Sequence, residues 1–511
     1  MNIAHNLDRA AWHFPNHEAI VFEGRSWTYG ELRAAVDRTA YGLAALGVDV
    51  GDRVGLFLPN IPAFPIAYLA VQKLGAIAVS INTMLTANEL EYIVADSGAG
   101  TIFTTGELLP RLKPLLAAGI DRERIVVCEG APGEHPTLEQ LAADGDTPFE
   151  ARERDQDDAA AILYTSGTTG RQKGAVLTHG NVISNMHATS HVLRLDPEDR
   201  SMLFLPLFHC FGQNFIMNTA LVSAATIVLH RRFVAEEVLE SISASGATRF
   251  FAVPAIYIGL LDAGVAPADL EPIRYYFSAA AMLPVEIGER WRERFGLPIH
   301  EGYGLTETSP HATHNHVWEH RAGTVGTPIE NVEVKVVDAD DCEVAAGTWG
   351  EVVIRGPNVM LGYWNRPDES GDALRGGWFH TGDIGFLDEA GYLSIVDRVK
   401  DMINVGGFKL WPREIEEVLY QHSAVTECAV IGVPDRVKGE LPVAIVVARG
   451  GAELRQESLK EFCRERLATY KIPSSFDFVD ELPKTPSGKI LKRVLRERGR
   501  ALSARSAMRT G

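Results

Sequence analysis

The first 100 residues alternate between helical and strand-like patterns of apolar positions. Residues 31–46 carry apolar side chains at helical spacing and end at Gly47, and residues 66–74 repeat this pattern behind Pro65, a residue suited to the first turn of a helix. A short apolar run follows each of these segments, at residues 52–57 and 76–81, and predicts a buried strand. This alternation of helix and strand is typical of an α/β fold.

The pattern changes scale towards the C-terminus. Residues 331–355 predict short strands joined by turns, and Pro412 opens a short amphipathic helix. Residues 428–433 and 443–448 predict apolar strands, and the apolar positions between Leu459 and Leu467 predict a second helix. These roughly 100 residues can form a small core of their own, so we expect a separate C-terminal domain that starts near residue 397.

Composition and charge narrow the class of protein. The 511 residues are 46% apolar and 23% charged, as in ordinary globular proteins, which excludes a wholly disordered, collagenous or coiled-coil chain. The net charge of −18 disfavours nucleic-acid binding but leaves room for a local basic pocket that holds a small polyanion. Five scattered cysteines give neither a disulfide framework nor a zinc pattern. The N-terminus has no apolar signal core and residues 215–229 are too polar for a membrane span, so we expect a soluble, cytoplasmic protein with no integral membrane segment.

The strongest chemical motif is the Gly- and Thr-rich segment 164–174, which follows a predicted buried strand at residues 159–163. Successive backbone N–H groups in such a loop form an anion-binding nest, and hydroxyl groups and one lysine add to it. The loop is not a Walker P-loop, because Gln172 precedes the lysine and Gly174 follows it. The sequence therefore predicts a phosphate-binding loop outside the P-loop kinases and GTPases, with the candidate ligands Thr165, Ser166, Gly167, Thr168, Thr169, Gly170 and Lys173.

Two further clusters suit the other parts of a nucleotide. In residues 302–309, Tyr303 between two glycines offers a flat face for a base, Thr306 offers a hydroxyl group for phosphate, and Glu307 offers a hard oxygen ligand for Mg²⁺. In residues 380–385, Asp383 lies in a Gly-containing loop and can accept hydrogen bonds from ribose hydroxyl groups. Taken alone, each cluster is equally compatible with an ordinary turn.

Two basic segments follow. Arg398 lies beside the expected domain boundary, within the charged run 397–401. Lys489 comes directly after Gly488 on a turn rich in Pro and Ser, where its ammonium group could neutralise a developing oxyanion. A solvated linker and a surface turn are the simpler interpretations of these two segments taken alone.

In this order and spacing, the five segments resemble the acyl-activating adenylate-forming superfamily, which comprises acyl-CoA synthetases, adenylation domains of peptide synthetases, and luciferases; the chain is most similar to fatty acyl-CoA synthetases. The resemblance covers essentially the whole chain. It implies an α/β fold in which residues 1–399 form a large N-terminal domain of three subdomains, two α/β sheets layered with helices plus a small β-barrel. Residues 400–511 would form a small, mobile α+β C-terminal domain.

The resemblance also implies a reaction in two halves. A carboxylate attacks the α-phosphate of Mg·ATP and gives acyl-AMP and pyrophosphate; the small domain then rotates, and a thiol attacks acyl-AMP to give a thioester and AMP. Because a carboxylic acid is already ionised at pH 7, the first half needs no general base, but it must bring two anions together. The implied cofactors are ATP, Mg²⁺ and coenzyme A, or the phosphopantetheine of a carrier protein in place of coenzyme A.

The resemblance assigns a role to each matching residue. Residues 165–173 would hold the β- and γ-phosphates, and Tyr303, flanked by Gly302 and Gly304, would stack on adenine opposite the small-residue loop that contains Ala279 and Ala280. Thr306 would contact phosphate, Glu307 would bind Mg²⁺, and Asp383 and Arg398 would hold the ribose. The remaining assignments are Lys489 bridging the α-phosphate and the attacking carboxylate, Lys400 at the hinge, Gly406 and Gly407 lining the thiol tunnel, and His209 at the acyl pocket.

Several choices within the family stay open. Arg436 and Lys438 favour coenzyme A over a carrier protein, since they offer basic partners for its 3′-phosphate. A medium- or long-chain fatty acid is the first expectation for the acid, from the apolar residues Phe250, Phe251, Val253 and Ile256; an aryl acid such as a benzoate or cinnamate is the second, with Phe211 and Tyr257 as stacking partners. Two alternatives from other functional classes remain: an inactive homologue that serves as a binding module, and a luciferase-type oxidase. The sequence does not decide between a monomer and a homodimer.

Overall fold

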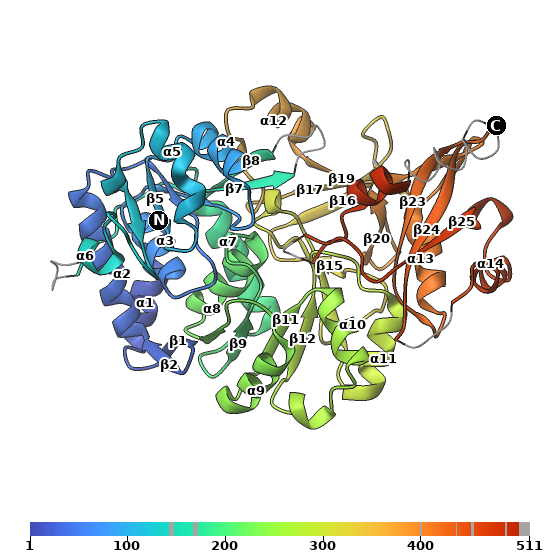
Figure 1. Ribbon diagram of the computed structural model, residues 1–511, viewed down its shortest axis with the longest axis horizontal. Helices are drawn as coiled ribbons and strands as arrows, with labels where there is room; N and C mark the ends of the chain where they lie inside the picture. Colours follow the sequence, from blue (N-terminus) through green and yellow to red (C-terminus); the bar gives the residue numbers. More distant parts are fainter. Residues whose placement is uncertain are drawn as a thin grey trace.

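The structure is a computed structural model that describes residues 1–142, 148–166, 172–398, 401–435, 437–450, 454–485 and 488–499. Two large sheets build most of the N-terminal part (Figure 1). The first has nine strands in the order β15 (Thr327–Pro328), β14 (Thr313–His314), β13 (Ile299–Tyr303), β12 (Tyr275–Ser278), β11 (Arg249–Ala252), β9 (Arg200–Leu203), β10 (Thr226–Leu229), β1 (Glu18–Phe22) and β2 (Arg25–Thr28). Its strands from β13 to β1 pair in parallel.

The second sheet has seven strands and a parallel centre. Their order is β18 (Gly362–Tyr363), β8 (Gln172–Thr178), β7 (Ala159–Ser166), β4 (Ile77–Ser80), β3 (Arg53–Leu56), β5 (Thr101–Thr104) and β6 (Ile125–Val127). The strands from β7 to β6 pair in parallel, whereas β8 and β18 are antiparallel. Parallel neighbours require crossover connections. The crossover from β3 to β4 is the helix predicted at residues 66–74, and the crossover from β4 to β5 is a further helix, at Ala87–Ser97.

The helices confirm the expected alternation with small shifts at their ends. The pattern at residues 31–46 corresponds to α2 (Tyr29–Ala45), which Thr28 caps and after which Gly47 takes a φ of 77°. The pattern at residues 66–74 corresponds to α3 (Ala63–Lys73), which starts three residues before the expected position because Pro65 is tolerated anywhere in the first turn, where no intrahelical N–H bond is needed. The other long helices of the N-terminal part are α1 (His5–His13), α4 (Ala87–Ser97), α7 (His179–Leu193), α9 (Ala235–Ser245), α10 (Pro254–Asp262) and α11 (Val285–Phe295).

The third subdomain differs in one respect from the expectation. Its strands β16 (Glu333–Val337), β17 (Gly350–Arg355), β19 (Phe379–Leu387) and β20 (Leu393–Arg398) form an antiparallel sheet whose path is open, so the small barrel does not close among the described residues. The reason is local: the outer edge of β20 bonds to the segment 325–326 through Val325 N–H to Leu393 O (2.8 Å) and Leu393 N–H to Gly326 O (2.8 Å), and does not pair with β16.

The C-terminal part contains a five-stranded sheet of its own, built from β22 (Phe408–Leu410), β21 (Ile403–Val405), β24 (Gly439–Ala448), β23 (Val425–Asp435) and β25 (Ser475–Val479). The helices α13 (Pro412–Tyr420) and α14 (Gln456–Arg464) pack on one face, where Ile415, Leu419, Leu459 and Cys463 enter a core separate from that of the N-terminal sheets. Leu482 and Leu495 belong to a second cluster with residues of the sheet. This part, orange to red in Figure 1, lies at one end of the long axis. In the described parts of the chain, no helix combines the length and apolar character that a membrane crossing requires.

Candidate active site

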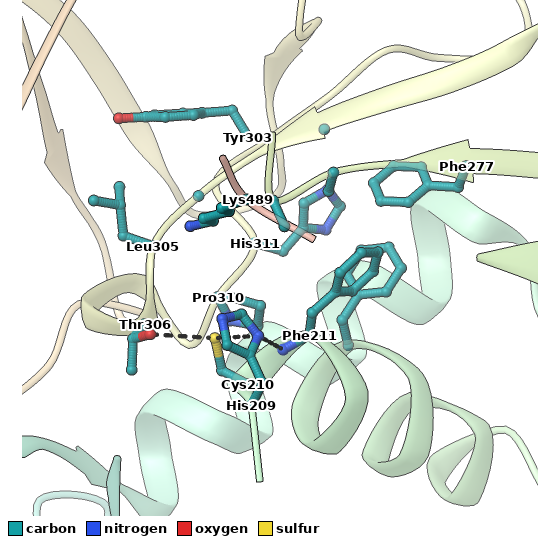
Figure 2. A pocket seen from close by; sticks show the side chains of 15 residues that line it. His209, Cys210, Phe211, Phe277, Tyr303, Leu305, Thr306, Pro310, His311 and Lys489 are labelled. Atoms are coloured by element: carbon teal, nitrogen blue, oxygen red, sulfur yellow. Dashed lines mark hydrogen bonds between the residues drawn. The ribbon is translucent and has the colours of Figure 1, made fainter. Parts of the chain in front are cut away.

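A cavity opens between the nine-stranded sheet and the loop that carries Lys489 (Figure 2). It encloses about 420 Å³ of empty space including its mouth. Its lining comes from four segments far apart in the sequence: His209, Cys210, Phe211, Phe215, Phe277, Ala279, Ala280, Gly302, Tyr303, Gly304, Leu305, Thr306, Pro310, His311 and Lys489. Of the expected site residues, His209, Ala279, Ala280, Gly302, Tyr303, Gly304, Thr306 and Lys489 therefore meet around one cavity.

Tyr303 forms a polar cluster with Asp383 and Arg398. The Tyr303 hydroxyl group donates to Asp383 Oδ2 (2.6 Å), and Arg398 Nε lies 2.7 Å from Asp383 Oδ1. The register of β19 and β20 places Asp383 directly opposite Arg398, and the carboxylate is buried while the guanidinium is partly exposed. Burial, and then the Asp383 carboxylate, raise the pKa of Tyr303 far above its usual value, so the hydroxyl group stays protonated. The three residues expected to bind adenine and ribose thus lie together beside the cavity.

Lys489 reaches the cavity from the C-terminal part. A turn presents it, in which Lys489 N–H donates to Thr485 Oγ1 (3.0 Å) and Gly488 has a φ of 79°. The loop packs tightly on the N-terminal part, since a Cβ atom on Gly488 would come within 2.6 Å of Val253 Cγ2. Burial and the neighbouring Arg398 lower the pKa of Lys489, whereas Asp383 and Glu307 act in the opposite direction. An incompletely solvated ammonium group at this position interacts strongly with an anionic ligand.

Glu307 and Lys173 both contact Tyr363. The Tyr363 hydroxyl group donates to Glu307 Oε1 (2.9 Å), and Lys173 Nζ lies 5.2 Å from the centroid of the Tyr363 ring. Lys173 is also 3.9 Å from Glu369 of α12 (Pro367–Ala373), and Thr165 pairs with it across β7 and β8. The described residues contain no group of three His, Cys, Asp or Glu side chains that could hold a metal ion. A cation held by Glu307 would therefore need ligands from the substrate, which is how Mg²⁺ usually binds with phosphates.

His209 is neutral and has a defined tautomer. Burial lowers its pKa to about 3, and its Nδ1 atom accepts a hydrogen bond from Phe211 N–H (3.2 Å), so the proton of the ring lies on Nε2. Cys210 Sγ lies 3.5 Å from Thr306 Oγ1 (Figure 2), and burial raises the pKa of this thiol to about 11. Neither residue carries charge at neutral pH, so Lys489 is the cationic group in the lining of this cavity.

The wall opposite Thr306 is aromatic. Phe215 stacks on Phe277 with 4.7 Å between ring centroids, and Phe211 and His311 meet Phe215 edge-on at 5.1 and 5.0 Å. Both nitrogen atoms of His311 have partners, Nδ1 with Thr189 Oγ1 (3.0 Å) and Nε2 with His314 Nδ1 (3.3 Å). Burial lowers the pKa of His311 to about 3. This wall therefore offers ring surfaces but no spare hydrogen-bonding group on the imidazole.

Sequence reasoning missed most of this wall and proposed other residues for it. Phe211, expected as a stacking partner of an aryl acid, lines the cavity, but Phe250, Phe251, Val253, Ile256 and Tyr257 do not. Phe250 and Phe251 are buried in β11, and the Tyr257 hydroxyl group donates to backbone oxygens of Phe250 (3.2 Å) and Phe277 (2.9 Å). Phe215, Phe277 and His311 were missed; only their closeness in sequence to the segments 206–212, 278–281 and 302–309 could have indicated them.

The other expected residues fall outside this cavity or outside the described residues. Gly406 and Gly407 form the exposed turn between β21 and β22, with Gly407 N–H donating to Asn404 Oδ1 (3.0 Å). Gly167, Thr168, Thr169, Gly170, Lys400 and Arg436 lie outside the described residues, as does the side chain of Ser166. Lys438 is exposed, and its backbone N–H donates to Asp435 Oδ1 (2.8 Å).

Known proteins resemble this chain over most of its length. The model of the family described as AMP-binding enzyme matches residues 7–364, and that of the AMP-binding enzyme C-terminal domain matches residues 414–489. A feruloyl-CoA synthase from Amycolatopsis is 37% identical, covering 95% of this chain and 96% of the relative, and a long-chain-fatty-acid–CoA ligase from Bacillus subtilis is 35% identical, covering 96% and 93%. The crystal structure of an anthranilate CoA ligase in complex with anthranoyl-AMP superposes with a TM-score of 0.93 at 31% identity and covers 99% of this chain and 98% of the other. ATP-bound MatB from Rhodopseudomonas palustris gives a TM-score of 0.90 at 32% identity, with 97% and 99% covered.

Proposed function

The chain belongs to the AMP-binding enzyme family, and on that premise we propose that it is an AMP-forming acid–thiol ligase. It joins a carboxylic acid to the α-phosphate of ATP with release of pyrophosphate, and then transfers the acyl group from acyl-AMP to the thiol of coenzyme A with release of AMP. The observation that carries this proposal is the position of Lys489, which the C-terminal part places in an apolar cavity bordered by the Tyr303–Asp383–Arg398 cluster.

Each group of the site has a distinct task in this reaction. The Tyr303 ring stacks on adenine, while Asp383 and Arg398 bind the ribose. Lys489 lies between the α-phosphate and the incoming carboxylate and offsets their mutual repulsion, which is the main barrier to bringing two anions together. Thr306 and the loop 165–173 bind phosphate, and the neutral His209 contributes an N–H group at the acid end of the cavity.

Glu307 is the proposed ligand of Mg²⁺. One carboxylate oxygen accepts the Tyr363 hydroxyl hydrogen, which orients the group, and Glu307 is buried with 8% of its surface exposed. When bound, the ion neutralises charge on the phosphates. Lys173 adds a positive charge for the β- and γ-phosphates. Its ion pair with Glu369 is long, at 3.9 Å, and therefore weak, so a phosphate group can replace Glu369 as its partner.

The Tyr363 contact yields a prediction about this ion. Tyr363→Phe removes the hydroxyl group that orients Glu307, and partners of metal ligands typically change metal affinity about tenfold or more, so the Mg²⁺ concentration for half-maximal adenylate formation is expected to rise about tenfold. Titration of Mg²⁺ at saturating ATP measures this. Tyr392→Phe is the control, because the Tyr392 hydroxyl group bonds the backbone oxygen of Glu319, away from the cavity. An unchanged Mg²⁺ requirement in Tyr363→Phe contradicts the assignment of Glu307.

The cavity favours an aryl acid, the second expectation from the sequence, over a long straight chain. Four contacting rings form its wall, and aromatic faces pack best against a planar substrate. A polar substituent pointing at His311 would be buried without a partner, at a cost of about 1–3 kcal/mol. The named relatives include both feruloyl-CoA and long-chain fatty-acid enzymes, so the acid is the point on which members of this group differ.

A panel of acids tests both the reaction and the acid. ATP–pyrophosphate exchange is measured with benzoate- and cinnamate-type acids, their ring-hydroxylated forms, and straight-chain acids of medium and long length, followed by mass spectrometry of the products with coenzyme A or a carrier protein. We expect kcat/KM for unsubstituted aryl acids to exceed that for long-chain acids at least about tenfold, which corresponds to about 1.4 kcal/mol. Preference for a long-chain acid refutes the aryl assignment, and absence of exchange with every acid refutes the ligase function.

The acceptor and the domain division are also proposals. Coenzyme A is preferred over a carrier protein because the exposed Lys438 offers a basic partner for its 3′-phosphate, and the mass spectra distinguish the two thiols. The separate core of the C-terminal part supports a division near residue 400, with Lys400 at the hinge and Gly406 and Gly407 facing the thiol after rotation.

A further inference from the structure

Arg413 joins the C-terminal part to the N-terminal part through several contacts of one side chain. It lies at the start of α13, and its side chain is 15% exposed. Its Nη1 atom donates to the backbone oxygen of Ile395 and lies 2.8 Å from Met282 Sδ, while Nε donates to Glu417 Oε1 (3.1 Å). Glu417 in turn accepts from Val285 N–H (3.4 Å). One guanidinium group thus links α13 to two segments of the N-terminal part.

These contacts lie directly behind the cavity. Met282 follows Ala280 by two residues, and Ala280 lines the cavity with a φ of 70°. Gly302, another lining residue, directly follows Glu301. The carboxyl group of Glu301 is buried, and two charged groups of α13 act on it, those of Arg413 and Glu417. Burial raises the pKa of Glu301 to about 8, more than Arg413 lowers it, so the carboxyl group is mostly protonated at neutral pH.

Helix α13 also holds the segment that carries Lys489. Glu416 Oε1 lies 2.9 Å from Lys492 Nζ, three residues beyond Lys489, and both side chains are largely buried. Arg413 and Glu417 therefore bind the N-terminal part from the same short helix that Glu416 ties to the Lys489 segment. A shift at Arg413 is therefore transmitted towards Lys489 through α13 and the Glu416–Lys492 ion pair.

We propose that Arg413 is a positioning residue for adenylate formation, which docks α13 against Met282 and Ile395 and so keeps Lys489 at the cavity. The inference rests on the proposed function, since it assigns to Arg413 the placement of Lys489. It predicts that the guanidinium bonds to Met282 and Ile395 matter, whereas an ion pair with Glu301 does not.

Half-reaction measurements on the full-length protein test this role. Arg413→Met keeps the apolar stem but loses the hydrogen bonds; we expect ATP–pyrophosphate exchange to fall at least about tenfold, while thioester formation from supplied acyl-AMP and coenzyme A changes less than about twofold. Arg413→Lys should restore part of the exchange rate. Glu301→Gln should leave exchange near the wild-type rate at pH 7, because a protonated carboxyl group and an amide are similar in shape and charge.

Arg449→Met is the matched control. Arg449 also crosses between the two parts, but its Nε lies 3.6 Å from Asp262 in a more exposed pair, so its loss should change neither half-reaction appreciably. Equal loss of both half-reactions in Arg413→Met, or no loss in either, overturns the proposal.

Hydrogen–deuterium exchange separates failure of this inference from failure of the ligase function. In Arg413→Met, backbone amides of residues 279–285 and 412–420 should exchange faster than in the wild type and in Arg449→Met, whether or not an acid substrate is known. Unchanged exchange in both segments refutes the docking role. If exchange is faster in Arg413→Met but the wild-type protein turns over no acid at all, the docking role is upheld and the ligase function is refuted.

Discussion

Lys489→Ala is expected to slow acyl-AMP formation on the order of 100- to 1,000-fold, the usual effect of removing one electrostatic stabiliser of a transition state. Thioester formation from supplied acyl-AMP and coenzyme A should change little. The difference arises because the first half-reaction must join two anions, the carboxylate and the α-phosphate, whereas in the second half the thiol attacks the neutral acyl carbonyl and AMP leaves with the electron pair of the broken bond. Lys489 is the cationic residue in the cavity lining, so within that lining nothing replaces it.

The measurement compares two assays on one protein preparation, ATP–pyrophosphate exchange for the first half and coenzyme A ester formation from acyl-AMP for the second. Lys484→Met is the matched control: Lys484 lies on the same loop but pairs with Glu427 at 2.6 Å, away from the cavity. It should keep both activities. Loss of both halves to the same extent in Lys489→Ala would falsify the assignment, since it would indicate a general structural effect.

The elements of this fold follow from sequence where local signals agree. Pro412 opens α13 at the expected residue, because proline suits the first helical position and apolar residues follow at helical spacing. The run 211–218 is different: it folds as a buried π-helix that includes Gln213 and Asn214, and the buried polar side chains find partners in each other and in Ser80. Such burial depends on residues more than 100 positions away, which no local pattern reports.

The candidate site, too, could be predicted from the sequence only in part. Tyr303, Asp383 and Arg398 were expected to act together because their motifs resemble a known family, and the structure brings them within hydrogen-bonding distance. The aromatic wall was not foreseen, since Phe250 and Phe277 are equally apolar and both lie in buried strands. The side of the strand that faces the cavity is set by the sheet register and by the packing of residues 211–218, so apolarity alone could not select Phe277.

Gly304→Ala tests how closely the site loop is packed, and it is expected to lower both stability and activity. A Cβ atom on Gly304 would stand 1.6 Å from the backbone oxygen of Pro310, well inside contact distance. The loop cannot easily yield, because Thr308 Oγ1 donates to the same Pro310 oxygen (2.8 Å) and accepts from Leu305 N–H (2.9 Å). We expect a loss of about 1–3 kcal/mol in the free energy of unfolding, as for other overpacked sites.

Activity should fall further than stability, because the displaced loop carries Tyr303, Thr306 and Glu307, and misplacing reacting groups by about 1 Å can cost on the order of 100-fold in rate. Chemical denaturation and ATP–pyrophosphate exchange measure the two effects separately. Gly371→Ala is the control, since a Cβ atom there meets nothing within 4 Å and alanine favours the helix α12 in which it lies. If Gly304→Ala matched Gly371→Ala in both measurements, the loop would have room to adjust, and the close packing of Gly304 against Pro310 would not be what holds Tyr303, Thr306 and Glu307 in place.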